Sequence, residues 1–274
     1  MKNRNEVKII IATHKKYRMP KDKMYLPLQV GAACNVDESG NLLNIGYNKD
    51  NVGENISKLN GSFCELTGLY WAWKNLDADY IGLAHYRRHF SMIRKMDKWD
   101  SILTYEQLKP YLGKVRVFTP SKRRYFIESL YSHYAHTHYA SQLDMTRRII
   151  RKKYPEYIPS YDKVVNHTYG YMFNMMILDK TLLDEYCSWL FDILFSLQHK
   201  IEERGLSAFQ KRCYGRISEI IFNVWLDKKL SSGEISKNQV KEIPYIHMEK
   251  INWCKKGKAF LMAKLFHKKY ESSF

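Results

Sequence analysis

Short apolar runs alternate along this chain with segments of helical character, and this order limits the folds open to it. The first run, VKIIIA at residues 7–12, is rich in β-branched residues and bounded by polar ones, which is typical of a strand buried on both faces. The predicted strands are 7–12, 80–86, 114–120 and 169–178, and the predicted helices are 61–75, 104–112, 124–153, 181–203 and 207–230. Strands that alternate with helices indicate an α/β fold around a largely parallel sheet.

Local signals refine this outline. Residues 20–60 are rich in Gly, Asn and Asp, which predicts a long loop, and long loops in compact domains are usually functional. Thr104 with Gln107, and Ser207 with Gln210, have the spacing of capping boxes that open helices. We see neither repeats nor a linker that would separate two domains.

Charge and cysteine content restrict the class of protein. The 274 residues carry a formal net charge of +17, which favours polyanions, anionic membranes or phosphorylated substrates as partners. The five cysteines are scattered without a CxxC pair, which is typical of a reducing cytosol. The N-terminal apolar run is too short for a signal peptide, and nothing reaches the roughly 18 apolar residues of a membrane-spanning helix. We therefore expect a soluble or peripheral protein.

The stretch ADYIGLAHYRRHF, residues 78–90, ends a predicted strand in basic and aromatic side chains. His85, Tyr86, Arg87 and Arg88 would then lie together at the carboxyl end of that strand. Arginine offers a planar fork suited to phosphate oxygens, so these residues predict a site for a dense anion such as a diphosphate. A solvated surface cluster, or an arginine paired with a structural carboxylate, is the alternative.

Several long motifs occur in an order that resembles the domain-of-unknown-function 4422 family of bacterial capsule and exopolysaccharide glycosyltransferases, some of them assigned to galactofuranose transfer. The motifs are IIIATHKKYRMP, NISKLNGSFCELTGLYWAWKN, YIGLAHYRRHF, YSHYAHTHY, YMFNMMIL, SAFQKRCYGRISE and MEKINW. The resemblance covers nearly the whole chain. It implies a single-domain, Rossmann-like fold of the GT-A type and a nucleotide-diphosphate sugar donor, with UDP as the expected nucleotide.

In such a fold the donor lies at the carboxyl ends of the parallel strands. The arginines of HYRR would there stabilise the leaving diphosphate without a metal. Asp77 and Asp79 spell the Asp-x-Asp that often holds a metal in this fold, but they precede their strand and suit an ordinary turn. We therefore predict no metal site, with Mn²⁺ or Mg²⁺ as the less favoured alternative.

Other residues are candidates for the same donor site. Thr13, His14 and Lys15 end the first predicted strand and would share the crevice, unless they are simply its polar terminus. In the following loop, side chains able to hydrogen-bond a base or ribose lie on both sides of Gly53, although loops commonly use such residues. They are Asp50, Asn51 and Asn55.

The helix predicted from Ser207 carries Arg212, Arg216, Glu219 and Asn223 on one stripe. We expect Arg212 and Arg216 to bind the donor. Glu219, kept ionised among arginines, could deprotonate an acceptor hydroxyl in an inverting transfer. An exposed ion-pair face is the alternative for this stripe, and Glu65 on the earlier aromatic helix is the rival base.

The acceptor sugar is assigned to the histidines of YSHYAHTHY, which are His133, His136 and His138, together with Asn174. Zinc is an alternative for the histidines, but no Cys or carboxylate completes a familiar ligand set. Ordinary helix packing is another.

Residues 251–270, INWCKKGKAFLMAKLFHKKY, combine lysines with Trp and Phe and suit the interface of an anionic membrane, with a solvated basic tail as the alternative. We thus predict a glycosyltransferase domain over residues 1–254 and a basic amphipathic tail over 255–274. The protein would be cytoplasmic, peripheral at the inner face of the membrane, and its acceptor a lipid-linked saccharide.

Two other functions compete with this prediction. The charge suggests a nucleic-acid-binding protein, but the basic residues are dispersed and no recognition module is visible, so we expect no nucleic acid partner. A glycan or phosphate hydrolase is the second alternative.

Overall fold

The computed structural model describes residues 5–202 and 204–249 of the chain and divides them into two compact units. The first unit comprises residues 5–121, Phe173–Cys187 and Ser236–Glu249. The second comprises Lys122–Met172 and, apart from residue 203, Ser188–Ile235. The α/β fold class predicted from the alternating pattern is confirmed.

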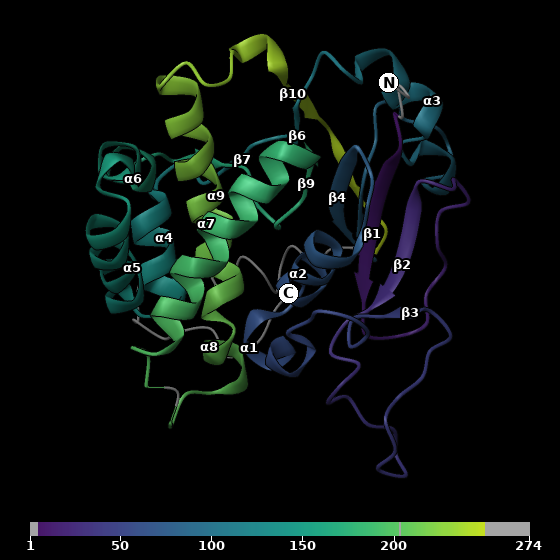
Figure 1. Cartoon of the computed structure of the whole chain (residues 1–274), viewed down its shortest axis with the longest axis horizontal. Helices are drawn as coiled ribbons and strands as arrows, with labels where there is room; N and C mark the ends of the chain where they lie inside the picture. The colour runs from purple at the N-terminus through teal and green to yellow at the C-terminus, as the bar shows by residue number, and fades with distance from the viewer. Residues whose placement is uncertain (1–4, 203, 250–274) are drawn as a thin grey trace. The chain divides into compact units, whose positions relative to one another are not determined.

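The first unit is built on one mixed sheet (Figure 1). Its main path runs in the order β10-β6-β9-β4-β1-β2-β3, and β5 joins β4 and β11 at one end. Six strands of that path are parallel to one another, and β9 alone runs against its neighbours β4 and β6. The strands are β1 (Val7–Thr13), β2 (Tyr25–Gln29), β3 (Asn48–Lys49), β4 (Tyr80–His85), β5 (Arg88–Phe90), β6 (Val117–Pro120), β9 (Met176–Asp179), β10 (Val240–Ile243) and β11 (Tyr245–His247).

Both faces of the central strands are covered, which explains the uninterrupted apolar run of β1. Ile9 and Ile11 pack in a core with Leu103 and Leu108 from the segment that follows β5. On the other face, Gly68 of α2 lies so close to the sheet that an added Cβ would be 3.2 Å from Ile10 Cδ1. The helical elements here are η1 (Ser57–Leu59), α1 (Asn60–Phe63), α2 (Leu66–Asn75), η2 (Trp99–Ser101), α3 (Tyr105–Leu108), η3 (Lys109–Tyr111) and η5 (Lys237–Gln239).

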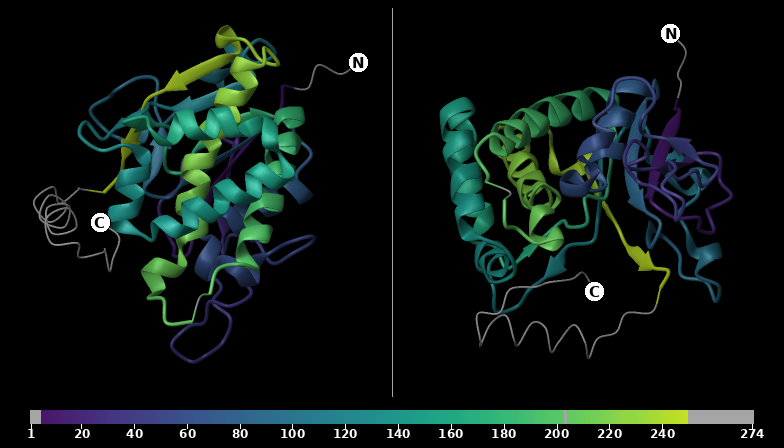
Figure 2. Two further views of the ribbon diagram at one scale, coloured as in Figure 1. Left: turned by 90° about the vertical axis from the view of Figure 1, so that its left-hand side faces the viewer. Right: turned by 90° about the horizontal axis from the view of Figure 1, so that it is seen from below.

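The second unit is mainly helical, and Figure 2 shows its helices in teal to yellow-green. The packing of α6 against α9 buries large rings such as Tyr161, Tyr214 and Trp225. A two-stranded antiparallel sheet of β7 and β8 completes it. Its elements are β7 (Arg123–Arg124), α4 (Leu130–Thr137), α5 (Ala140–Lys153), η4 (Pro155–Tyr157), α6 (Ile158–Val165), β8 (Tyr169–Gly170), α8 (Ala208–Lys211) and α9 (Cys213–Ser231), while α7 (Lys180–Gln198) begins in the first unit.

Several predicted elements are divided. The helix predicted over 61–75 breaks at Cys64, whose φ is +54°. The strand predicted over 169–178 becomes β8 and β9, separated by a turn in which Phe173 and Asn174 also have positive φ. Side-chain periodicity carries no information on such local backbone conformations, so each segment was predicted from the sequence as one continuous element.

The helices predicted over 124–153 and 207–230 are each interrupted as well. The first becomes α4 and α5, and the second breaks at Arg212 between α8 and α9. The capping box of Thr104 and Gln107 is confirmed. Ser207 also accepts the backbone N–H of Gln210, but the Gln210 side chain donates to Thr137 O instead of returning to the cap.

The predicted boundary at residue 254 and the tail over 255–274 lie outside the described residues, so both stay predictions. Within residues 5–202 and 204–249, no helix is both long enough and apolar enough to cross a bilayer.

His89 of β5 makes stability depend on pH. It is completely buried near the rings of Tyr25 and Trp99, and burial lowers its pKa from 6.5 to about 4 because the imidazolium would lose its hydration. As the pH falls, the unfolded chain therefore binds this proton at a higher pH than the folded protein does. Neutral His89 stabilises the folded state above the unfolded pKa, and this stabilisation is lost between about pH 6.5 and pH 4. We expect the free energy of unfolding to fall by about 2 kcal/mol from about pH 7 to pH 5 through this residue.

Urea denaturation of the wild type and of His89→Phe at both pH values measures this effect. His133 also has a lowered pKa, but it is present in both proteins and cancels in the comparison. Equal pH dependence in the two proteins would contradict the assignment to His89.

Candidate functional site

In the first unit, basic and aromatic side chains gather where β1 and β4 end. Ala12 pairs with His85 in the parallel ladder, so the residues after each strand emerge side by side. The buried ring of Tyr86 is their centre, and the His85 and His14 rings lie 4.4 Å and 5.4 Å from it. We call this group the strand-edge cluster, which comprises His14, Lys15, Tyr17, His85, Tyr86 and Arg87.

The cations of the strand-edge cluster already share one anion. Lys15 Nζ and Arg87 Nη1 each lie 3.8 Å from a carboxylate oxygen of Glu249. The same two cations lie 5.2 Å and 5.4 Å from the centroid of the Tyr86 ring. Long, partly exposed ion pairs of this kind are weak, so a more highly charged anion could replace Glu249.

The other residues expected at this edge have different surroundings. The Thr13 hydroxyl is buried and donates to Lys15 O at 2.7 Å, which shapes the turn after β1. Arg88 lies over the ring of Phe173, at 4.4 Å from its centroid, and pairs with His247 of β11. The structure thus brings Lys15 and Arg87 together and places Arg88 on another aromatic surface.

Asp50 organises the loop after β3. It is completely buried, and its carboxylate accepts the backbone N–H groups of Gly31 and Ala32 at 2.9 Å and 3.0 Å. The hydroxyls of Thr67 and Ser57 also donate to it. Complete burial with four hydrogen bonds corrects the expectation that Asp50 contacts a base or ribose: it fixes the loop.

Two amides in the same loop remain candidates for ligand contact. Asn55 Nδ2 donates to Gly53 O at 2.8 Å, so this side chain shapes the loop. Asn51 is half-buried beside Asp50 in the sequence. Their contact with the donor stays a prediction.

Glu65 and Asn174 meet in the first unit. Asn174 Nδ2 donates to Glu65 Oε1 at 2.8 Å, where Asn174 is buried and Glu65 is half-buried. Glu65 directly precedes α2, which returns to β4, and Asn174 precedes β9, which is antiparallel to β4 with Met176 opposite Leu83. Both side chains therefore belong to the edge of the sheet where β4 ends.

The backbone around this pair is strained. Cys64 has φ +54°, Phe173 +74° and Asn174 +53°. Residues with a Cβ adopt this region at a cost, and such strain persists where the surrounding structure imposes it, often at functional sites. Asn174 was assigned to the acceptor sugar from its unusual place in an apolar run, and the structure adds that it holds Glu65.

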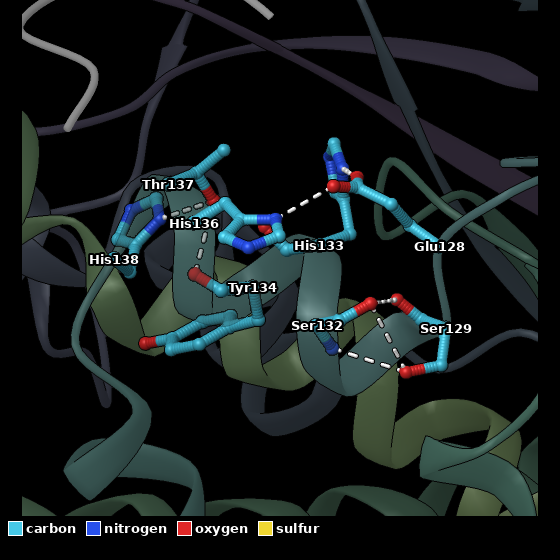
Figure 3. Close-up of polar contacts among 8 residues, drawn as sticks. All are labelled: Glu128, Ser129, Ser132, His133, Tyr134, His136, Thr137 and His138. Carbon is cyan, nitrogen blue, oxygen red and sulfur yellow. Dashed lines mark hydrogen bonds and ion pairs between the residues drawn. The ribbon is translucent and has the colours of Figure 1, made fainter. Parts of the chain in front are cut away.

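In the second unit, two of the three predicted histidines share one carboxylate (Figure 3). His133 Nδ1 lies 2.7 Å from one oxygen of Glu128, and His136 Nδ1 lies 2.6 Å from the other. Glu128 is buried just before Ser129, which caps α4. Glu128 is not among the residues predicted from the sequence, although a carboxylate just before a histidine-rich helix was a signal for it.

Burial and charge set the protonation of this group. Burial, with a contribution from the charges of Arg123 and Arg216, lowers the pKa of His133 to about 4 despite the hydrogen bond to Glu128. Burial alone would raise the pKa of Glu128, but its interactions with His133 and His136 outweigh that effect and lower it. We therefore expect His133 to be neutral and Glu128 ionised near neutral pH.

His138 is separate from this group. It is buried with its ring between Tyr134 and Phe209, each 5.0 Å away, and its Nδ1 lies 3.1 Å from the Thr137 hydroxyl. This burial corrects the assignment of His138 to the acceptor sugar and favours the packing alternative.

The stripe predicted on the helix after Ser207 forms largely on α9. Arg216 Nη1 donates to Glu219 Oε1 at 3.1 Å, and Glu219 is only 5% exposed. Asn223 accepts the N–H of Tyr171 and donates to its carbonyl, at 2.7 Å and 2.9 Å. Arg212 lies at the break between α8 and α9. Glu219 and Asn223 of the stripe therefore make contacts within the second unit. Donor binding by Arg212 and Arg216 stays a prediction.

Asp79 of the Asp-x-Asp sequence lies away from the strand-edge cluster. The Asp79 carboxylate accepts the backbone N–H of Glu6 at 2.8 Å, next to the start of β1, and therefore lies at the opposite edge of the sheet from the strand-edge cluster. The part of the chain that the structure describes holds no group of three or more His, Cys, Asp or Glu side chains placed to bind a metal ion.

Comparison with known proteins places this geometry in a wider context. A search of curated proteins found no match. A solved structure described as the apo form of the WbbM bifunctional glycosyltransferase is similar, with a TM-score of 0.80 and 30% sequence identity over 90% of this chain. The chain covers 46% of that protein's chain, so it spans about half of its length.

These similarities agree with the architecture of the sheet. The mostly parallel sheet flanked by helices is a GT-A-like fold, as expected from the sequence motifs. The family described as "Domain of unknown function (DUF4422)" matches residues 8–230. Since this match includes most of the chain, the protein belongs to the DUF4422 family.

Proposed function

We propose that this chain is a glycosyltransferase that moves a hexosyl unit from a nucleotide-diphosphate donor to a saccharide acceptor. The observation that carries the proposal is the strand-edge cluster, where Lys15 and Arg87 converge on one carboxylate at the carboxyl ends of β1 and β4. Open α/β sheets bind their ligands at this edge. The similarity to a glycosyltransferase structure supports the reaction class.

The finer identity of the substrates is also part of the proposal. UDP-galactofuranose is the donor and a lipid-linked oligosaccharide of capsule or exopolysaccharide synthesis is the acceptor, in keeping with the family resemblance of the sequence motifs. Such an acceptor requires the enzyme at the inner face of the cell membrane, where the protein would be peripheral.

The reaction would be a single displacement. The acceptor oxygen forms a bond to the anomeric carbon while the bond from that carbon to the diphosphate breaks. A carboxylate takes the proton of the acceptor hydroxyl, and the diphosphate leaves with the bonding electron pair. Arg87 and Lys15 stabilise the charge that develops on the diphosphate, and their contacts strengthen as the bond breaks. One such displacement inverts the anomeric configuration.

Glu65 is the better candidate for the base. It is half-buried, its orientation is fixed by Asn174, and it belongs to the same edge of the same unit as the strand-edge cluster. Glu219 is nearly fully buried and already paired with Arg216, which leaves it little surface for an acceptor hydroxyl. A general base must reach the proton that it removes.

A separate part of the proposal, which concerns the second unit alone, assigns acceptor binding to His136 and His133. Both are partly exposed, and Glu128 fixes the Nδ1 side of each ring. This leaves Nε2 of each ring for other partners, and imidazole groups suit sugar hydroxyls. Binding of the donor by Arg212 and Arg216 is a less supported part of the proposal.

A thermal-shift screen of the purified protein against nucleotides and nucleotide sugars tests this function. A ligand at about a hundred times its dissociation constant should stabilise the folded protein by about 2.7 kcal/mol. We expect UDP and UDP-sugars to raise the transition temperature of the wild type and to act more weakly on Arg87→Ala. If no nucleotide or nucleotide sugar shifts the transition, the proposal loses its basis.

A further inference from the structure

A short segment of the second unit exposes large apolar side chains next to consecutive cations. Its sequence, KRRYFI at residues 122–127, covers β7 and the start of the loop before α4. Phe126 is 81% exposed and Ile127 is 69% exposed. Adjacent exposed side chains of this size mark a surface that has a partner more often than single exposed residues do.

The backbone holds Phe126 in this exposed position. Ile127 N–H donates to Tyr125 O at 2.7 Å, which closes a three-residue turn with Phe126 at its centre and φ +59°. This kind of γ-turn is rare and strained for a residue with a Cβ. Tyr125 anchors the base of the turn, because its N–H donates to Thr168 O at 2.8 Å and its ring lies 4.3 Å from His133.

Two arginines, Arg123 and Arg124, contribute positive charge to this segment. Arg123 lies over the Tyr125 ring, 4.7 Å from its centroid, and neither Arg123 nor Arg124 forms an ion pair with another residue of the described chain. Glu128, the nearest acidic residue in sequence, is buried against His133 and His136. The apolar pair therefore stands beside two arginines that no acidic side chain within residues 5–202 and 204–249 neutralises.

We propose that residues 122–127 form a membrane-contacting segment for a bilayer that contains anionic phospholipid. Phe126 and Ile127 enter the boundary between headgroups and acyl chains, while Arg123 and Arg124 contact lipid phosphates. Exposed aromatic and aliphatic groups next to unneutralised arginines are complementary to such an interface. This inference depends neither on the transferase reaction nor on the predicted tail, because vesicle binding by this segment needs no donor.

Co-sedimentation of the full chain with lipid vesicles tests the proposal. The vesicles contain phosphatidylcholine alone or mixed with phosphatidylglycerol. We expect the double variant Phe126→Asn/Ile127→Ser to partition onto the mixed vesicles about tenfold more weakly than the wild type. Its thermal stability should be retained, because both side chains are exposed and Asn tolerates positive φ.

Two controls separate this effect from general changes. Leu42→Ser/Val52→Ser removes another exposed apolar pair, 56% and 63% exposed, from loops of the first unit and should bind vesicles like the wild type. Arg124→Ala should weaken binding about fivefold on the mixed vesicles and leave binding to phosphatidylcholine unchanged.

Three results would overturn the proposal. One is unchanged vesicle binding by the Phe126/Ile127 double variant, and another is an equal loss in the Leu42/Val52 control. The third is normal vesicle binding by the double variant with reduced affinity for a short-chain lipid-linked diphosphate saccharide, which would assign the segment to the acceptor.

Discussion

Arg87→Ala should lower the turnover number of sugar transfer by about a hundredfold, since a charge-assisted contact to the leaving diphosphate would be lost. The guanidinium of Arg87 lies 3.8 Å from Glu249 and 5.4 Å from the centroid of the Tyr86 ring, and the residue belongs to the turn between β4 and β5. Its side chain is not part of the core, so the fold should survive. Steady-state kinetics with the donor identified by the thermal-shift screen measures the loss.

Matched variants make this result specific. Arg87→Lys should recover only part of the activity, because lysine keeps the charge but lacks the bidentate fork. Arg94→Ala removes an exposed arginine from the same unit and should leave turnover unchanged. Activity should persist in a chelator, since arginine and lysine neutralise the diphosphate in this proposal. Full activity of Arg87→Ala, or inactivation by the chelator that manganese reverses, would contradict it.

The gathering of residues at this edge was predictable from the sequence for a general reason. The carboxyl ends of adjacent parallel strands lie at the same edge of a sheet, so two runs that end in basic and aromatic residues bring those residues together. Lys15 and Arg87 are 72 positions apart in the sequence and approach the same carboxylate. The same rule placed Asp79 at the opposite edge, where its carboxylate accepts the Glu6 N–H.

Other parts of the site depend on contacts that no local pattern encodes. Asp50 has the composition of a ligand-binding loop residue, and only its burial against Gly31, Ala32 and Thr67 identifies it as a structural anchor. The carboxylate between His133 and His136 comes from the preceding loop and not from their helix. Short strands such as β2, hidden in the predicted loop over 20–60, also depend on their neighbours in the sheet.

The choice between the two candidate bases likewise required the structure. Both glutamates were assigned to helices in the sequence, and both were candidates for the base. The contacts separate them, because Glu219 is closed in by Arg216 while Glu65 is oriented by Asn174 through a 2.8 Å hydrogen bond. The stripe on α9 was the clearer periodic pattern in the sequence. One of its members, Asn223, instead hydrogen-bonds the backbone of Tyr171.

Glu65→Gln should therefore lower turnover by about a hundredfold to ten-thousandfold, the range typical of a lost general base. Glutamine keeps the shape of the side chain and can still accept the hydrogen bond from Asn174, but it cannot take the proton of the acceptor hydroxyl. Donor affinity and thermal stability should stay near the wild-type values, because the change removes neither a diphosphate contact nor a core side chain.

Parallel variants decide between this role and a structural one. Glu219→Gln should reduce turnover far less than Glu65→Gln, and Asn174→Ala should give an intermediate loss because it frees the Glu65 side chain to reorient. A misfolded site would weaken donor binding and turnover together, whereas a missing base lowers turnover alone. Near-normal turnover of Glu65→Gln, with a large loss in Glu219→Gln, would move the proton transfer to α9 and overturn the assignment made from the sheet edge.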